Sequence, residues 1–360
     1  MKPNSPVSTL PTLIVGQGIA GTLLAMRLWQ NHQPFMICDR GAGNTSSAIA
    51  SGLINPVVVK HFGLTWMATT LLPEADTFYS YLEKLTGARF YHTLPIFRIF
   101  HQPHQAELWN RRRVEENAES FMSKASADVP PHIHAPFGGG WIQKAARVDV
   151  ESFIKATRNF FMNNNVLSPG QLDESQLQPV AGGWKYKEEV YARVVFCQGA
   201  QTPANPWTAK LPVNPLKGQL LSIATTAFSQ QYALSRKVFV LPQGGDSFKV
   251  GATWEHTQQP GTTPEAKQQL LQHLKKLTHP NASASPIKIT GHYYGFRPTV
   301  PDRRPLLGQY HHHPGLYIFN GLGSKGYMLA PWLSKHLYEH IFLQKKLIRE
   351  VDVERYGGKK

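Results

Sequence analysis

The chain has 360 residues, of which 41% are hydrophobic, so it is long enough for two structural units with a substantial buried core. Its 38 Lys and Arg residues exceed its 23 Asp and Glu residues, which gives a formal net charge of +15. This excess attracts polyanions and is compatible with a nucleic-acid partner, although the basic residues are scattered along the chain. The longest apolar stretch, residues 10–29, contains three glycines and Arg27, which argues against a membrane span, and no secretory signal is visible. We therefore expect a cytoplasmic protein without a membrane partner.

Cysteine and histidine give no sign of a metal site. Cys38 and Cys197 stand in separate apolar runs without metal-ligand spacing, so we expect buried free thiols. Three adjacent histidines, 311–313, precede Pro314 with no carboxylate at ligand spacing, and they predict an exposed turn. We expect no bound metal.

The first chemical signal is a glycine pattern that follows a short apolar run. Residues 13–15 are typical of a buried parallel strand, and Gly16, Gly18 and Gly21 follow in the order GxGxxG. The first glycine allows a tight turn, the second admits a pyrophosphate close to the backbone, and the third lets the next helix pack on the strand. We predict that helix over residues 20–31, with its unpaired N–H groups directed at the phosphates.

A second predicted strand, residues 34–38, ends at Asp39. This carboxylate lies 18 positions after Gly21, where an acidic side chain accepts hydrogen bonds from ribose hydroxyls. The complete unit predicts a bound dinucleotide but does not separate NAD from FAD. FAD extends further and is usually held by distant segments as well.

Three distant segments of this kind are present. Residues 45–56 are rich in small side chains, as a backbone lying close to a cofactor requires. Residues 192–200 form a predicted strand that closes on Gly199. Residues 315–331 combine a strand, a glycine turn and a helix start, which would direct N–H dipoles at an anionic ring edge. These segments favour FAD.

At these segments the sequence resembles the D-amino-acid-oxidase and glycine-oxidase superfamily of FAD-dependent enzymes, over nearly the whole chain. The motifs that carry the resemblance are GQGIAG with Asp39, SSAIASGLINP, VVFCQGA, PLKGQLLSI, FVLPQGGDSFKVGAT, GFRPTVPDRRPLLG and NGLGSKG. Within the superfamily the pattern is most similar to the oxidoreductase domain of the bifunctional enzyme that matures 5-aminomethyl-type wobble uridines in tRNA. That family has Arg where this chain has Lys325, and glycine oxidases place a carboxylate-binding Arg at the position of Ser324, which makes a free-glycine oxidase less favoured.

The resemblance implies an α/β fold, α+β overall, with a Rossmann-like FAD-binding domain and a discontinuous, antiparallel-sheet substrate domain like that of glycine oxidase. We assign residues 1–60, 145–204 and 295–360 to the FAD-binding domain, and residues 61–144 and 205–294 to the substrate domain. The predicted elements include a helix over 148–163, a strand near Val166, a strand over 219–225, a hairpin over 238–253, and a helix carrying Leu270, Leu271, Leu274 and Leu277.

The resemblance also assigns roles to two cations. Arg297, in GFRP, is the expected clamp for a substrate carboxylate, since its planar fork suits bidentate binding; the alternative is a structural bridge between two loops. Lys325 is expected at the pyrimidine edge of the flavin; the alternative is a solvated lysine. The predicted contacts to non-covalently bound FAD are Gly16, Gly18, Ile19, Ala20, Gly21, Asp39, Arg40, Ser46, Ser47, Ser51, Gly52, Leu53, Leu172, Gly199, Gly323, Ser324, Lys325, Gly326 and Tyr327.

The function implied is the oxidation of an amine that carries a carboxylate, of amino-acid or N-substituted glycine type. Hydride passes to FAD, the imine hydrolyses, and oxygen reoxidises the flavin to give peroxide. Three alternatives stay open: a stand-alone oxidoreductase acting on the carboxymethylaminomethyl group of a tRNA wobble uridine, a non-catalytic flavin-binding protein, and an NAD-linked dehydrogenase. The expected partner is thus a small amine or a modified tRNA, and the sequence does not encode the oligomeric state.

Overall fold

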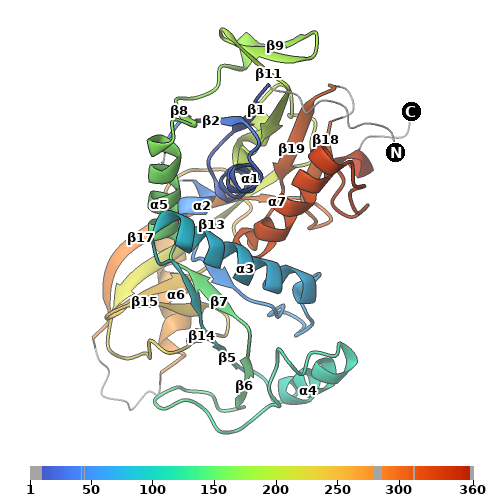
Figure 1. Ribbon diagram of the computed structural model, residues 1–360. Helices are drawn as coiled ribbons and strands as arrows, with labels where there is room; N and C mark the ends of the chain where they lie inside the picture. Colours follow the sequence, from blue (N-terminus) through green and yellow to red (C-terminus); the bar gives the residue numbers. More distant parts are fainter. Residues whose placement is uncertain (1–9, 42, 44, 279–285, 311–312, 357–360) are drawn as a thin grey trace.

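The computed structural model describes residues 10–41, 43, 45–278, 286–310 and 313–356, and two large sheets organise them (Figure 1). The first is a six-stranded sheet in the order β18-β19-β12-β1-β2-β8, in which the pairs from β19 to β8 are parallel and β18 is antiparallel to β19. Its strands are β1 (Thr12–Val15), β2 (Phe35–Asp39), β8 (Leu167–Pro169), β12 (Arg193–Phe196), β18 (Leu306–Gln309) and β19 (Leu316–Asn320).

Long helices pack beside this sheet, and a buried arginine joins three of them. They are α1 (Ile19–Gln30), α3 (Ala68–Thr86), α5 (Val150–Asn163) and α7 (Gly326–Leu343). Arg27 of α1 pairs with Glu74 of α3 at 2.7 Å, lies 3.6 Å from the ring centroid of Phe78, and donates to the Pro331 carbonyl of α7 at 3.2 Å. The guanidinium of Arg27 is therefore paired inside the protein.

The second sheet has seven strands in the order β17-β13-β16-β15-β14-β5-β6. All its pairs are antiparallel except β14 with β5. The strands are β5 (Ile96–Ile99), β6 (Gly139–Ile142), β13 (Asn214–Ala224), β14 (Ala233–Ser235), β15 (Phe239–Gly244), β16 (Ser247–Gly251) and β17 (Lys288–Thr299). Helix α6 (Pro264–Lys275) is capped by the hydroxyl of Thr263, which accepts from the Ala266 N–H, and it ends near the β14–β15 turn.

The two faces of the seven-stranded sheet have different neighbours. Leu221, Val240 and Val250 belong to the buried cluster that also contains Leu270 and Leu274 of α6. Because side chains alternate along a strand, residues one position away point to the opposite face. A Cβ added at Gly295 of β17 would lie 3.6 Å from Ile49 of α2 (Ser46–Ile49). The face opposite α6 therefore looks toward the loop that the sequence assigns to cofactor binding.

The remaining elements are smaller. A three-stranded sheet, β11-β10-β9, forms a protrusion next to the six-stranded sheet, and a second one has the order β3-β7-β4 (Figure 1). Their strands are β3 (Leu53–Ile54), β4 (Tyr91–Thr93), β7 (Ala146–Val148), β9 (Leu177–Val180), β10 (Gly183–Tyr186) and β11 (Glu189–Tyr191). Helix α4 (Gln105–Glu115) and the 3-10 turns Glu174–Gln176, Gly199–Ala204 and Val353–Tyr356 complete the described chain.

The predicted fold class is confirmed, and the predicted elements shift by a few residues. The helix predicted from residue 148 begins at Val150, and the strand predicted over 219–225 starts earlier, at Asn214. Strand β17 runs to Thr299, past the boundary that we placed at residue 295, because it pairs with β13 up to Asn214. Cys38 and Cys197 are buried free thiols.

The predicted turn of three histidines, residues 311–313, lies only partly within the described chain. His311 and His312 lie outside the described residues, whereas His313 is half-buried against Trp184 and Trp207. In the described part of the chain, no group of His, Cys, Asp or Glu side chains is arranged to hold a metal ion. None of the helices in that part combines the length and apolar character needed to cross a bilayer.

Candidate active site

The GxGxxG turn is shaped by close backbone approaches. Gly16 has φ +101°, and a Cβ there would lie 2.8 Å from the carbonyl oxygen of Cys197 in the neighbouring strand segment. A Cβ at Gly21 would lie 1.9 Å from the Gly16 carbonyl oxygen, which no side chain can accommodate. These two positions therefore require glycine for packing, as the sequence predicts for the first and third members of the motif.

The N-terminus of α1 has no side-chain cap from its own N-cap residue. Gly18 caps the helix without any side-chain hydrogen bond, and a Cβ at Gly18 would lie 3.0 Å from Ser47 Oγ. The Ile19 N–H donates to Ser47 Oγ at 2.9 Å, so α2 meets the glycine turn. Among the described residues, buried Gln17 Nε2 has no hydrogen-bond partner. Free N–H groups at a helix start are a ready site for a phosphate.

Asp39 lies at the end of β2, beside the glycine turn. Its carboxylate accepts hydrogen bonds from the Gln17 and Gly41 N–H groups, both at 2.8 Å, and pairs with Arg158 of α5 at 3.1 Å. Arg158 also donates to Gln17 Oε1 at 2.6 Å, and it was not among the predicted residues. Arg40 points elsewhere: its guanidinium lies 2.6 Å from the amide of Gln201 in the orientation that satisfies both groups.

The N-terminus of α7 lies beside that of α1. A Cβ at Gly326 would lie 3.1 Å from Ile19 Cγ2, and α7 also begins without a side-chain cap. The Tyr327 hydroxyl donates to the Ser47 carbonyl at 2.9 Å, which ties α7 to α2. The positive ends of two helix dipoles thus converge on one place, which favours an anionic ligand.

Lys325 is the residue that caps α7. Its Nζ donates to the Asn55 carbonyl at 3.3 Å and to the Thr65 hydroxyl. Burial lowers the pKa of Lys325 to about 8. The side chain is therefore held inside the protein rather than solvated, whereas Ser324 beside it is exposed.

The small-residue loop connects the cofactor region to the seven-stranded sheet. The Ser46 hydroxyl donates to the Phe296 carbonyl of β17, and the Gly323 N–H donates to the Pro298 carbonyl at 3.0 Å. Ser51 Oγ accepts from the Leu53 N–H at 3.4 Å, and a Cβ at Gly52 would lie 2.0 Å from the Val148 carbonyl oxygen. The SSAIASG loop, the GFRP strand and the GLGSKG turn are therefore neighbours.

Arg297 lies on the face of β17 that looks toward α2. Its guanidinium donates to the Thr253 carbonyl at 3.2 Å and to the Lys217 carbonyl at 3.4 Å, and lies 4.3 Å from the ring centroid of Trp254. Trp254 itself is 59% exposed. Burial lowers the pKa of Arg297 to about 10, so the group stays charged at neutral pH. These two carbonyl acceptors fix the position of the Arg297 guanidinium without neutralising its positive charge.

A buried ion pair supports this arginine from the far side of β13. Lys217 is 1% exposed, and its Nζ lies 3.7 Å from Glu255 Oε2. Glu255 also accepts from Gln219 Nε2 at 3.0 Å and from the Thr253 hydroxyl. Because Thr253 supplies the carbonyl to Arg297, this network holds the acceptor of the arginine in place.

Lys249 of β16 lies on the same face of the sheet as Arg297, and we did not predict it. Its Nζ donates to the Ala50 carbonyl at 3.2 Å, next to the small-residue loop. Burial is the main cause that lowers the pKa of this amine. The sequence did contain a signal for this position. Lys249 stands between the apolar residues Phe248 and Val250, which are buried on the α6 side, so the alternation of side chains places Lys249 on the opposite face.

Other predicted residues lie further from this junction. Leu172 is buried in the same cluster as Val15 and Cys38. Gly199 follows β12, where its carbonyl accepts from Asn320 Nδ2 at 2.9 Å, so that the ends of β12 and β19 are tied together. Two residues of β17 that are not among the predicted contacts lie on different faces: Tyr293 shares the Arg297 face and is 44% exposed, whereas His292 alternates to the α6 side.

A glycine turn at the end of a parallel strand and two helix starts without a side-chain cap from their own N-cap residues are typical of a dinucleotide-binding protein. An antiparallel sheet with a fixed arginine lies next to them. A family model described as "FAD dependent oxidoreductase" (DAO) matches residues 12–340. The chain belongs to this family, and its cofactor is FAD.

One relative and two solved structures agree with this assignment. Over 97% of its length the chain is 24% identical to the tRNA 5-methylaminomethyl-2-thiouridine biosynthesis bifunctional protein of Marinobacter nauticus, and it spans only 59% of that protein. The solved structure of glycine oxidase from Geobacillus kaustophilus is similar with a TM-score of 0.79 and 18% identity, covering 94% of this chain and 95% of that one. Iminodiacetate oxidase from Chelativorans sp. BNC1 follows with a TM-score of 0.76 and 20% identity, covering 96% and 98%. At these identities the two structures support the fold alone.

Proposed function

We propose that this chain oxidises a primary or secondary amine that carries a carboxylate, of amino-acid or N-substituted glycine type. The observation that carries the proposal is Arg297, a charged fork held by two carbonyl groups on the sheet face that looks toward the cofactor loop. The names of the two similar structures, glycine oxidase and iminodiacetate oxidase, agree with this proposal, since glycine and iminodiacetate are both carboxylate-bearing amines.

The residues of the chain fit FAD as the acceptor. The glycine turn and the α1 N-terminus would hold the pyrophosphate, Asp39 the ribose, and the start of α7 with Lys325 the ring. FAD, when bound, supplies a two-electron acceptor. Lys325 places a positive charge among carbonyl and hydroxyl groups, and its lowered pKa of about 8 makes that charge easily lost unless an anionic group lies nearby.

Arg297 would bind the carboxylate of the substrate and so orient its α carbon. The reaction removes a hydride from that carbon and a proton from the nitrogen, and a C=N bond forms. Water then adds and splits the imine, so that an N-carboxymethyl amine yields glyoxylate and the shortened amine. The shortened amine and glyoxylate are therefore the products to seek.

The experiment is an anaerobic titration of the purified flavoprotein with glycine, sarcosine, iminodiacetate and D-amino acids, while the oxidised-flavin absorbance is followed. Bleaching with formation of the keto acid supports the proposal. A yellow protein that none of these amines bleaches, in the presence of a working chemical reductant, would favour the non-catalytic alternative.

A second candidate places the same carboxymethylamino group on a wobble uridine of tRNA. The net charge of +15 and the exposed ring of Trp254 beside Arg297 favour it, because stacked aromatics commonly hold unpaired bases. The name of the Marinobacter relative points the same way. Bleaching by carboxymethylaminomethyl-containing tRNA, without bleaching by free amino acids, would select this candidate.

A further inference from the structure

A compact basic pocket lies at the edge of the seven-stranded sheet remote from Arg297. Five side chains line this hollow of about 150 Å³: His101, Arg236, Lys237, His273 and Lys276. They come from the segment after β5, the β14–β15 turn and the end of α6. Arg236 is fixed in position, because it donates to the Lys276 carbonyl at 2.9 Å.

Within the described chain, none of the five residues that line the pocket takes part in an ion pair. Arg98 lies directly behind the pocket, 2% exposed, bonded to the Ser235 hydroxyl and the Arg236 carbonyl, and its Nε has no partner among the described residues. Burial, followed by neighbouring cations that include Arg236 and Lys237, lowers the pKa of both His101 and His273.

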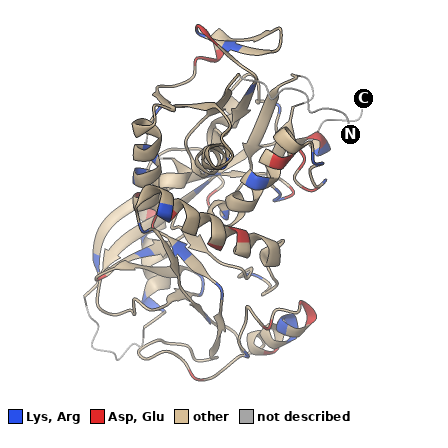
Figure 2. Cartoon of the chain, viewed as in Figure 1, with Lys and Arg blue, Asp and Glu red and all other residues tan. Residues whose placement is uncertain are grey.

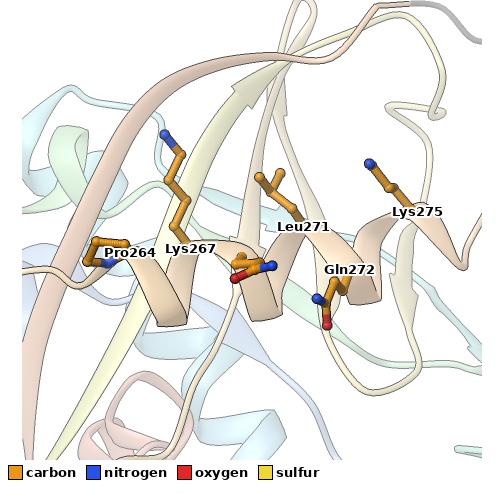
Figure 3. Close-up of a pocket in the computed structure, with 6 residues that line it drawn as sticks. Pro264, Lys267, Leu271, Gln272 and Lys275 are labelled. Carbon is orange, nitrogen blue, oxygen red and sulfur yellow. The ribbon is translucent and has the colours of Figure 1, made fainter.

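The basic surface continues along α6. Lys267, Leu271 and Lys275 project from the same side of the helix, and with Pro264, Gln268 and Gln272 they line a hollow of about 410 Å³ (Figure 3). Lys267 and Lys275 are eight residues apart, which corresponds to about 12 Å along a helix. Lysine and amide donors therefore form a row that leads to the basic pocket.

The surrounding chain is also unbalanced in charge. Residues 205–294 carry nine Lys or Arg and three Asp or Glu, whereas residues 61–144 carry eight of each. Figure 2 shows the contrast, since α4 mixes both signs while cations predominate around α6. Of the two segments that we assign to the substrate domain, only residues 205–294 carry an excess of cations, and this segment contains the α6 row and most of the pocket.

We propose that this basic face, formed by the pocket and the α6 row, binds the phosphate backbone of a folded RNA. A single small anion would engage the pocket and leave the row unused, whereas a chain of phosphates engages both. The lining is mainly Lys, Arg, His and Gln, while protein interfaces carry an apolar core.

The α6 row and Arg297 lie on opposite faces of the seven-stranded sheet, so only a large ligand that passes around the sheet edge contacts both. The register places Arg98, Ser235, Phe239, Gly251, Leu220 and Tyr293 in one row across the sheet. Five strand spacings separate the first and last of these residues, about 24 Å. A folded RNA spans this distance easily, and a mononucleotide does not. RNA binding by this face does not depend on the oxidation of an amine, so either proposal can fail without the other.

The test compares two triple variants of the full flavoprotein. Lys237→Gln/Lys275→Gln/Lys276→Gln removes three exposed lysines of the basic face, and Lys84→Gln/Lys124→Gln/Lys155→Gln removes three exposed lysines elsewhere. Fluorescence anisotropy with an end-labelled tRNA transcript gives Kd over a range of salt concentrations. We expect the first variant to bind at least tenfold more weakly at 100 mM salt, with a slope of log K against log salt reduced by about 2. The second variant should resemble the wild type.

Three results would overturn the inference: no tRNA binding by the wild type, equal losses in both variants, or equally tight binding of polyglutamate with the same dependence on the three lysines. Flavin reduction by a small amine serves as an independent readout, since these lysines lie outside the amine site. If no amine bleaches any of the proteins, the amine proposal fails while the RNA result stands on its own.

Discussion

The proposed cofactor half and the proposed substrate half of the candidate site are shaped by different kinds of atoms. Around GxGxxG, the shape is set by backbone atoms: added Cβ atoms at Gly16 and Gly21 would lie 2.8 and 1.9 Å from carbonyl oxygens. Around Arg297, the shape is set by charged and polar side chains that hold one another, with Lys217 and Glu255 behind the arginine. The first half should therefore tolerate no added atom, and the second should respond to changes of charge in graded steps.

The largest effect is expected in the backbone-built half. Gly21→Ala places a methyl group against the Gly16 carbonyl and must push α1 away from β1, so the variant should purify without FAD or fail to accumulate in soluble form. The ratio of flavin to protein absorbance measures this. Gly43→Ala is the control, because a Cβ there meets no atom within 4 Å; loss of FAD from the control as well would contradict the packing explanation.

Arg297 is the next most sensitive position. Arg297→Lys keeps the charge but loses the fork, and we expect kcat/KM for a carboxylate-bearing amine to fall about 10- to 100-fold, mainly through KM, since hydrogen bonds to charged groups contribute about 1.5–3 kcal/mol. Steady-state kinetics with FAD content held equal measures it. Arg303→Lys, at an exposed arginine of the same segment, should leave both constants unchanged. An unaltered KM in Arg297→Lys would favour the structural-bridge alternative.

The buried ion pair behind Arg297, Lys217 with Glu255, can be tested through the stability of the protein. Glu255→Gln leaves the ammonium of Lys217 buried without its partner, so the free energy of unfolding should fall by about 3 kcal/mol. The double variant Lys217→Met/Glu255→Gln removes both charges and should recover most of that loss. Urea unfolding of the wild type, of Glu255→Gln, of Lys217→Met and of the double variant gives the values, and simple additivity of the two changes would show that the pair is not coupled.

The smallest effect concerns Lys325 and pH. Its pKa is about 8 in the folded protein, below the value of about 10.4 for an unfolded lysine, so between these pH values the unfolded chain binds more protons. The stability of the wild type relative to Lys325→Met should therefore rise as pH increases from 8 to 10.4, and stay constant below pH 8, where the full cost of the buried charge is present. Thermal unfolding from pH 7 to 10.5 measures the difference. Parallel curves would contradict the burial of this amine.

The difference between the two halves also explains which parts of the candidate site could be predicted from the sequence. The glycine turn, Asp39 and the helix after them lie within about 30 residues, so spacing alone predicts their arrangement, and the structure places them together. Arg158 and Lys249 escaped prediction because their roles depend on α5 packing beside β2 and on the register of β16. Arg297 was predicted through the resemblance, but its supports, Thr253 and the Lys217–Glu255 pair, follow only from pairing between β13, β16 and β17.

The most direct test of the central claim compares matched amines with and without a carboxylate. Sarcosine and dimethylamine, and glycine and methylamine, are mixed anaerobically with the wild-type flavoprotein, and the rate of loss of the oxidised-flavin absorbance is recorded over a range of concentrations. If Arg297 binds the carboxylate, at least one carboxylate-bearing member will bleach the flavin and its partner will be slower by about 100-fold or more. Equal rates within each pair would contradict the account.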